Sequence, residues 1–474
     1  MSDDQYQLIR NASIRQNANI FPSLHQILSE KSKCYPAEME ITETSAKCSL
    51  QSMVIHTVSR ILDQSLDKLT DADSDSSGTL FMKAGFDGAS SQSIYNQKYV
   101  ESDLGEAVLN EQSLFQTALV PLKLVIAGQD VWINEKPSSS HFCRPLHLQY
   151  KKETKEVTVA EENRINDEIE KLSNFLTELN LPNGRTISLS LDFKIELTML
   201  DGKAVNALTD TNYSQACNVC AAKPGDMNNL AVVRSKEVSD RALKLGISSL
   251  HCWIRSFECF LHIGYKLENK TFQARTPEQK NSVAIRKKEI QRRCREELNL
   301  IVDTPKQGFG NTNTGNTARR AFEESSVFAD ILGIEEDIII RVRNILKAVC
   351  SGYNLDIVKF KDYCLRTSEM FVEKYGWYVM PPTLHKLLEH GFQVAEILDL
   401  PIGAYSEEAQ EANNKIIRNA RLNHSCKVSR INTMRNQFSH LLIRTDPVIS
   451  SIYFKKCKSY GGKPLDEDVV KLLV

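Results

Sequence analysis

The spacing of apolar residues changes along the chain, and this change constrains the fold more than any other feature. Between residues 79 and 201, runs such as "TLFMKAGFD" and "RTISLSLDFKIELTMLDG" alternate apolar and polar residues with the period of a β-strand. From residue 202 to 395, apolar residues recur at helical spacing, as in "EEDIIIRVRNILKAVC". We therefore predict an α/β unit followed by a large, almost entirely helical region, with further helices near both ends of the chain.

Within the α/β unit, two more strands are predicted in "QSLFQTALVPLKLVIAG", which Pro121 should limit, and in "CRPLHLQYKKE". The segment "VTVAEENRINDEIEKLSNFLTELNLPNG" is predicted as an amphipathic helix that Pro182 and Gly184 end. Before this unit, "LQSMVIHTVSRIL" has helical spacing, and Thr44 or Ser45 is the predicted N-cap.

Composition narrows the class of protein. The chain has 474 residues, which is too many for one hydrophobic core. A composition of 41% hydrophobic and 25% charged residues is typical of a packed protein. A net charge of -1 gives no overall basic field, so a nucleic-acid partner would have to bind local basic patches. No apolar run reaches the roughly 18 residues of a membrane span, the first residues do not resemble a secretory signal, and the 12 cysteines are scattered. We expect a soluble intracellular protein whose thiols are mostly reduced.

Two aspartates, Asp87 in "GFDG" and Asp201 in "MLDG", end predicted strands and are followed by glycine. Carboxylates that meet at strand ends suit a hard divalent cation such as Mg²⁺. Two such ions about 4 Å apart can stabilise both oxygens of an in-line phosphoryl displacement. The small residues at positions 88 to 91 would leave room for metal and substrate. The alternative is that both aspartates simply cap turns, which is common.

Cysteine and histidine form a second pattern. Cys217 and Cys220 make a CxxC turn, and His385 and His390 lie in "LHKLLEH", so together they offer a complete tetrahedral Zn²⁺ ligand set. The long separation of the two pairs would make such a metal a clasp between distant segments. The alternative is an unrelated CxxC turn and two helical histidines.

A third pattern lies in "GAYSEEAQEANNKIIRNARLNHSCK", where acidic residues cluster at the start of a helix and basic residues follow. Glu411, Lys415 and Arg418 fall at i, i+4 and i+7, and Arg421 continues the basic run. A phosphate backbone that crosses these residues would explain the pattern. The alternative is a solvent-exposed helix with a chance bias.

Taken together, these motifs resemble those of the Transib transposases, and through them the catalytic core of the V(D)J recombinase large subunit, from near residue 5 to about 450. The resemblance rests on "GFDG", "MLDGKAV", "CNVC", "LHKLLEH" and "GAYSEEAQEANNK" in this order. It implies that Asp87, Asp201 and Glu411 are the catalytic acids, with Glu408 as the alternative to Glu411.

The resemblance also implies roles for further residues. It makes Cys217, Cys220, His385 and His390 a structural zinc site and His251, in "SSLHCWIR", an active-site neighbour. The loop "GNTNTGNTARR", with Arg319 and Arg320, would lie near the scissile DNA. A tryptophan that stacks on a flipped base in the recombinase has no clear match near Cys350, where Tyr353 is the nearest aromatic candidate.

The implied architecture is an RNase H-like DDE domain, α/β, interrupted by a helical zinc-binding insertion. Its expected parts are a helical DNA-binding and dimerisation region (1–78), the RNase H-like domain (79–201, completed by 396–415), the insertion (202–395) and a basic helical C-terminal region (416–474).

The implied activity is cut-and-paste DNA transposition: nicking of element ends, hairpin formation on flanking DNA and joining of 3′-OH ends to target DNA. The expected cofactors are two Mg²⁺ (or Mn²⁺) per active site and one structural Zn²⁺. The expected partners are double-stranded DNA, both terminal inverted repeats and target, and a second copy of the chain. The resemblance implies a nuclear location and no membrane. The alternative function is a domesticated, catalytically weak DNA-binding protein of the same fold.

Overall fold

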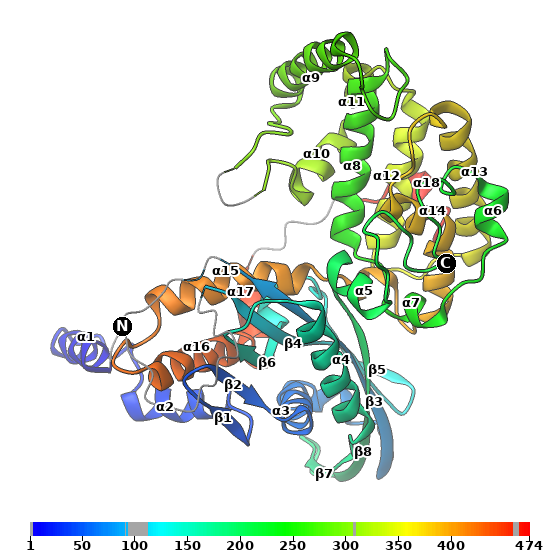
Figure 1. The fold of residues 1–474 in the computed structure, drawn as a ribbon. Coiled ribbons are helices and arrows are strands. Elements are labelled where there is room, and N and C mark those ends of the chain that lie inside the picture. The colour runs from blue at the N-terminus through cyan, green and yellow to red at the C-terminus, as the bar shows by residue number, and fades with distance from the viewer. Residues whose placement is uncertain (1–2, 91, 93–111, 307–309, 458–463) are drawn as a thin grey trace.

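The computed structural model describes residues 3–90, 92, 112–306, 310–457 and 464–474. These residues form a mixed α/β lobe built on one curled sheet and a second lobe made of helices (Figure 1). Helix α8 (Ser249–Lys266) and the short helix α5 (Gly202–Leu208) lie where the two lobes meet. The coarse prediction of an α/β unit with a large helical region is confirmed.

The sheet has eight strands in the order β1-β2-β6-β4-β3-β8-β7, with β5 paired to β4. Strands β3 and β8 run parallel, and the other neighbours are antiparallel. The strands are β1 (Met39–Ile41), β2 (Ser45–Cys48), β3 (Asp75–Ala89), β4 (Leu114–Ile126), β5 (Gln129–Ile133), β6 (Arg144–Gln149), β7 (Phe175–Asn180) and β8 (Thr186–Met199). Because β4 is antiparallel to both β3 and β6, the carboxyl ends of β3, β6 and β8 lie at the same edge of the sheet.

Helices from distant parts of the chain complete the core of this lobe. They are α3 (Leu50–Leu62), α4 (Lys155–Glu170), α15 (Glu408–Asn423) and α16 (Arg430–Arg444). Each contributes buried apolar side chains, such as Met53 from α3 and Phe438 from α16, to one cluster with the strands. Helices that precede and follow the helical lobe in sequence therefore belong to the sheet lobe.

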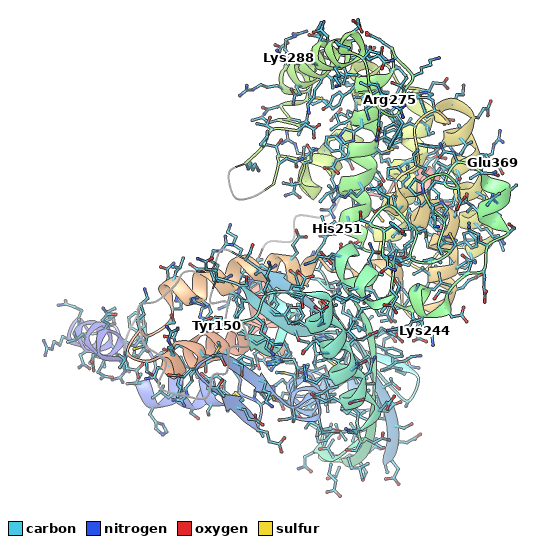
Figure 2. All side chains as sticks on the ribbon, in the orientation of Figure 1. Tyr150, Lys244, His251, Arg275, Lys288 and Glu369 are labelled. Atoms are coloured by element: carbon cyan, nitrogen blue, oxygen red, sulfur yellow. The ribbon has the colours of Figure 1, made fainter. Side chains whose placement is uncertain are left out.

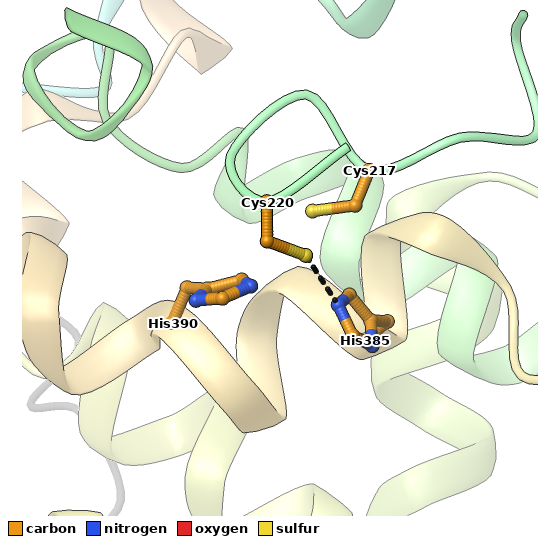
Figure 3. A group of neighbouring side chains, drawn as sticks. All are labelled: Cys217, Cys220, His385 and His390. Atoms are coloured by element: carbon orange, nitrogen blue, oxygen red, sulfur yellow. Dashed lines mark hydrogen bonds between the residues drawn. The ribbon is translucent and has the colours of Figure 1, made fainter. Parts of the chain in front are cut away.

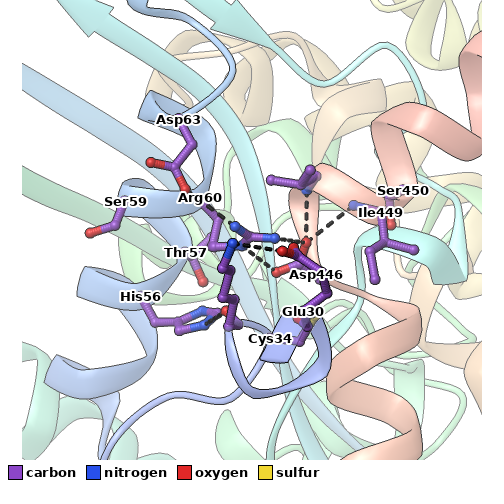
Figure 4. A network of polar contacts seen from close by, with 12 residues as sticks. Glu30, Cys34, His56, Thr57, Ser59, Arg60, Asp63, Asp446, Ile449 and Ser450 are labelled. Atoms are coloured by element: carbon purple, nitrogen blue, oxygen red, sulfur yellow. Dashed lines mark hydrogen bonds and ion pairs between the residues drawn. The ribbon is translucent and has the colours of Figure 1, made fainter. Parts of the chain in front are cut away.

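A buried polar network fixes the C-terminal helices to this lobe (Figure 4). Arg60 of α3 donates hydrogen bonds of 2.8 and 3.1 Å to the carboxylate of Asp446, which is fully buried and caps α17 (Pro447–Lys456). The buried guanidinium of Arg144 bonds Thr445 O and His56 Nδ1 nearby. Burial, followed by the charge of Arg144, lowers the pKa of His56 to about 4, so His56 is neutral and can accept this bond.

The second lobe packs around α8. Its helices are α6 (Leu230–Arg234), α7 (Asp240–Lys244), α9 (Pro277–Leu298), α10 (Gly315–Glu323), α11 (Ser325–Leu332), α12 (Glu336–Cys350), α13 (Ile357–Tyr375) and α14 (Pro382–Ile397), joined by α18 (Glu467–Val470) from the C-terminus. The rings of Phe257 and Phe260 of α8 contact those of Phe328 and Phe322 at centroid distances of 5.4 and 6.1 Å. This aromatic centre gives the lobe a core of its own.

Three local predictions were wrong. Pro121 does not limit its strand but lies inside β4 at a bulge, opposite Met82, where its carbonyl accepts a hydrogen bond from Asn134. The predicted helix that continued to Pro182 ends at Glu170, and its second half forms the edge strand β7. Helix α3 is capped by Ser49, because the segment containing Ser45 is strand β2.

The N-terminal region also contains α1 (Asp3–Arg15) and α2 (Leu24–Ser32), which extend away from the sheet (Figure 1). Among the described residues, every helix is too short or too polar to cross a membrane.

Candidate metal centre and zinc cluster

The pairing of β3 with β8 brings the two predicted aspartates together. The last paired residues of the two parallel strands are Gly85 and Met199. Asp87 lies two residues beyond the first and Asp201 two residues beyond the second, so both carboxylates occupy equivalent positions on neighbouring strands, which lie roughly 5 Å apart. Asp201 also caps α5, because its Oδ1 accepts a hydrogen bond of 2.7 Å from Ala204 N.

Gly85 and Gly88 lie on either side of Asp87, and each position requires glycine for a different steric reason. A Cβ at Gly85 would lie 2.0 Å from Met199 O, so only glycine lets β3 approach β8 this closely. A Cβ at Gly88 would lie 2.6 Å from Cβ and 2.8 Å from Oε2 of Glu153. Gly88 therefore makes room for a third acid. Of the small residues that follow, Ser90 is exposed, and Ser91 lies outside the described residues.

Glu153 is a site residue that the sequence analysis missed. It follows the end of β6 by four residues, at the same sheet edge as Asp87 and Asp201. Lys203 forms an ion pair of 3.1 Å with its carboxylate. The signal was present in "CRPLHLQYKKE", since an acid placed just after a predicted strand is the pattern that identified the other two.

Helix α15 presents a fourth acid to this edge. Asn414 Nδ2 donates a hydrogen bond of 2.6 Å to Asp87 Oδ2, and one turn later Arg418 donates to Ser90 O at 3.0 Å. Glu411 lies three residues before Asn414, on the same face of the helix. Its negative charge raises the pKa of Asp87. Glu408, the alternative acid, instead forms an ion pair with Arg319 of α10.

Buried contacts fix α15 on the sheet. Gln116 of β4 donates to Asn414 Oδ1 at 2.5 Å and to Gln410 O at 3.3 Å. Just before the helix, the carbonyl of Ser406 accepts a hydrogen bond of 2.6 Å from Lys83 of β3, which is completely buried. Burial lowers the pKa of Lys83 to about 7. Lys83, four positions before Asp87 on β3, therefore holds Ser406, the residue that precedes Glu407.

Three acids of this edge have raised pKa values. Burial, together with the charges of Asp201, Glu153 and Glu411, raises the pKa of Asp87 to about 6 against the opposing effect of the Asn414 hydrogen bond. The pKa of Glu153 is raised by burial and by Asp201. Glu411 is exposed at the surface, yet partial desolvation and the nearby acids raise its pKa too. The acids at this edge thus repel one another, and a bound cation would relieve that repulsion.

His251, at the start of α8, lies at the junction of the lobes (Figure 2). Its Nδ1 is 2.7 Å from Ser248 Oγ and 3.3 Å from Oε1 of Glu407, a buried acid that also accepts a hydrogen bond from Ser248. The hydrogen bond to Glu407, and then the charges of Glu407, Glu411 and Asp201, raise the pKa of His251. An imidazole at this place beside the acids is suited to contact a phosphate oxygen.

The side chains predicted to contact DNA differ in their exposure and in their present contacts. Arg319 and Arg418 are half-buried and already contact Glu408 and Ser90 O, while Lys415 and Arg320 are exposed. Arg421 differs from the expectation, because it is 1% exposed and its guanidinium lies 4.4 Å from the centre of the Tyr150 ring. A side chain held in the core by this cation–π contact does not form part of a basic surface.

The cysteine and histidine pairs meet as predicted (Figure 3). Cys217 and Cys220 come from the loop after α5 and His385 and His390 from α14; all four are buried and their ligand atoms lie within 4.8 Å of one another. Cys220 Sγ is 3.4 Å from His385 Nε2. Among the described residues, this is the one group of three or more cysteine, histidine, aspartate or glutamate side chains whose ligand atoms lie this close together.

The chemistry of this group fits a structural metal such as zinc. His390 Nε2 is buried without a hydrogen-bond partner, while its Nδ1 is 2.8 Å from Gln393 Oε1, which would fix the ring for coordination through Nε2. Hydrogen bonds from Cys220 and then from the two histidines hold the pKa of Cys217 well below its usual range, as a metal-ligating thiolate needs. Four protein ligands would complete a tetrahedron and leave no position for substrate.

Comparisons with known proteins add no identification: neither a protein-family model nor a curated protein matches the chain. Function must therefore be inferred from the geometry described above and from the motifs of the sequence.

Proposed function

We propose that the chain is a DDE-type DNA transposase of the Transib kind. The observation that carries the proposal is the convergence of Asp87, Asp201 and Glu411, from widely separated parts of the sequence, at one edge of one sheet. Glu153 adds a fourth carboxylate at the same place. Structural capping alone does not account for four mutually repelling acids.

The strand order supports an RNase H-like assignment for the sheet lobe. Strands β3, β4 and β6 are antiparallel neighbours, and β8 lies parallel to β3 on its other side. Asp87 lies near the end of β3, Asp201 follows β8, and Glu411 lies on α15, which packs on β3; this arrangement is expected of a DDE centre. The helical lobe lies in sequence between Asp201 and α15, which supports its assignment as an insertion.

In this proposal, Asp87, Asp201 and Glu411, with Glu153 beside them, would hold two Mg²⁺ or Mn²⁺ ions. The bound ions supply the charge that stabilises the attacking and leaving oxygens of a phosphodiester displacement. Asn414 orients the Asp87 carboxylate through its 2.6 Å hydrogen bond. His251 contacts a phosphate oxygen from the α8 side of the site.

The reaction sequence repeats one displacement. Water attacks the phosphodiester at the element boundary and leaves a 3′-OH; this hydroxyl attacks the opposite strand and closes a hairpin on the flanking DNA. The excised 3′ ends then attack target DNA. The chain would act in the nucleus as a homodimer, since two element ends must be joined together. The zinc cluster would clasp the insertion and keep α15 in position.

The test is strand cleavage by purified protein on duplexes taken from the DNA that flanks its coding sequence, with Mg²⁺. Asp87→Asn, Asp201→Asn and Glu411→Gln should each abolish nicking while leaving DNA binding and folding intact. Normal nicking by any one of these variants would remove that residue from the centre. Labelled 3′-OH ends separate a transposase from a nuclease, because only a transposase yields joined products.

A second function is a domesticated DNA-binding protein that has lost catalysis. One contact favours it: the ion pair between Arg319 and Glu408 links the helical lobe directly to α15 and could restrict access to the acids. DNA binding without nicking by the wild-type chain in either Mg²⁺ or Mn²⁺ would support this second function.

A further inference from the structure

A cavity of about 590 Å³ lies beside Asp201. It opens between α5, the loop that carries the zinc-cluster cysteines, and the first turns of α8 and α14. His251, which marks this place in Figure 2, is part of its wall. The cavity thus connects the carboxylate centre with the zinc cluster.

The charged side chains in the wall are mostly basic. Lys155, Lys203, Arg255, Lys386 and His251 line the cavity, and Asp201 is the acid among the lining residues. Four of these five already contact acidic side chains: Lys155 pairs with Asp210, Lys203 with Glu153, Arg255 with Glu258 and His251 with Glu407.

Lys386 is different. It belongs to the first turns of α14 and has no ion-pair partner in the part of the chain that the structure describes. A half-buried ammonium group that faces a polar cavity is costly unless an anion neutralises it. Asp201 and Cys217 also line the wall, but Asp201 would bind the metal ions of the proposed centre and the Cys217 thiolate would bind the structural metal. Lys386 would then be left without a neutralising anion.

Two helix N-termini reinforce this imbalance. Helix α14 begins after Pro381, which offers no capping side chain, and the N-cap residue of α8, Ser248, directs its hydroxyl to Glu407 instead of to its own helix. The first backbone N–H groups of both helices are left without side-chain caps, and residues of both first turns line the cavity. Uncapped N–H groups and the positive ends of two helices favour an anion, as Lys386 does.

We infer that this cavity binds a phosphate of the DNA strand next to the reacting bond, with Lys386 as its principal cation. The inference rests on the proposed function, because the position of the cavity beside Asp201 sets which phosphates can reach it. A volume of about 590 Å³ accommodates a phosphate together with its sugar, and the asparagine side chains of the wall, Asn206 and Asn212, offer further hydrogen bonds. The pocket fixes the strand beside the metal centre, which is how an active site positions a substrate for in-line attack.

The test is a charge-neutralisation scan on the full-length protein. The probe is a fluorescein-labelled duplex with an element boundary, in Ca²⁺, with a single methylphosphonate placed in turn at each phosphate near the boundary. Binding is measured for wild type, Lys386→Gln and a matched control, Lys471→Gln, whose lysine lies at the end of α18 and pairs with Asp468.

The expected result is one position where the methylphosphonate weakens binding by wild type and by Lys471→Gln about tenfold, yet has little further effect on Lys386→Gln. The salt dependence of binding should fall by about 0.9 in slope for Lys386→Gln. An equal loss at every position for wild type and Lys386→Gln would overturn the inference. If Lys386→Gln unfolds or loses bound metal, Arg255→Gln, whose side chain is 54% exposed, replaces it and must show the same coupling.

The outcome is distinguishable from failure of the proposed function. Nicking of unmodified duplex by wild type, with no coupled phosphate, would exclude the pocket and leave the transposase proposal standing. A coupled phosphate without nicking would support the pocket and exclude the transposase proposal.

Discussion

The hydrogen bond from Asn414 to Asp87 offers the sharpest test of the carboxylate centre. Asn414 Nδ2 lies 2.6 Å from Asp87 Oδ2, and the bond lowers the pKa of Asp87 against the effects of burial and three other acids. Asn414→Ala removes this donor. The replacement keeps a strong helix former in α15, and Gln116, which loses Asn414 Oδ1 as an acceptor, still donates to Gln410 O.

The size of the effect follows from the type of bond. A hydrogen bond to a charged group contributes about 1.5 to 3 kcal/mol, and each pH unit of pKa corresponds to about 1.4 kcal/mol. Loss of the bond should therefore raise the pKa of Asp87 from about 6 by about one to two pH units. At neutral pH the protonated carboxyl would then compete with metal binding.

The assay is the initial rate of nicking as a function of pH at fixed Mg²⁺. The acidic limb of the profile should move to higher pH by about one to two units, so that Asn414→Ala loses about tenfold or more near pH 6.5 and recovers near pH 8.5. Asn419→Ala, on the exposed side of the same helix, is the control and should leave the limb unchanged.

A uniform loss of rate at every pH would refute the reasoning. It would mean that Asn414 acts only through the position of α15 and not through the protonation of Asp87. Thermal melting of the variant provides the independent measure, since a merely structural role would lower the melting temperature.

Three further predictions concern metals and stability. Cys217→Ser should remove one equivalent of zinc and lower the melting temperature, whereas the control Cys259→Ser, at a cysteine buried in the helical core, should keep the metal. Full zinc content in Cys217→Ser would contradict the assignment of Cys217 as a metal ligand. Asp446→Asn should lower the free energy of unfolding in urea by about 3 kcal/mol, because Arg60 loses its buried charged partner. A change below about 1 kcal/mol would mean that Asp63 replaces Asp446 as the partner of Arg60. The pKa of Asp87 is about 6 in the folded chain against an ordinary value of 3.8, so its contribution to stability is complete at low pH and is lost as pH rises through 6, an effect of about 3 kcal/mol. Bound Ca²⁺ should therefore raise the melting temperature more at pH 7.5 than at pH 5. An equal rise at both pH values would exclude the carboxylates as the Ca²⁺ site.

Much of the fold could be predicted because the apolar period is local information. Strands β3 and β8 and helix α12 have long, clear patterns, and the sequence predicts each of them. Strand β7 was assigned to the preceding helix because "FLTELN" is a half-exposed edge strand whose polar residues also fit a helix. Its identity depends on pairing with β8, which local spacing does not encode.

The site was predictable only where an acid ended a recognisable strand. Asp87 and Asp201 met this condition, and the motif order then indicated Glu411. Glu153 also follows a predicted strand, but it was missed because it lies in a charged run, "KKETKE", that is typical of an exposed loop. Lys83 was missed for a different reason: a lysine within an apolar strand gives no sign of its partner, which is a backbone carbonyl more than three hundred residues away.

The long helical segment between β8 and α15 raises the question of how α15 returns to the sheet with the accuracy that the proposed catalysis needs. Closing a longer loop adds little entropy cost, so length itself is tolerated, but it provides no accuracy. Accuracy must come from contacts at the point of return. Lys83 holds Ser406 before the helix, and the bonds of Gln116 and Asn414 hold its first two turns. The cysteine and histidine cluster brings the loop after α5 against α14, so a segment near the start of the helical lobe lies beside one near its end. Glu411 lies among these contacts, which explains how a residue so distant in sequence can reach the sheet edge that carries Asp87.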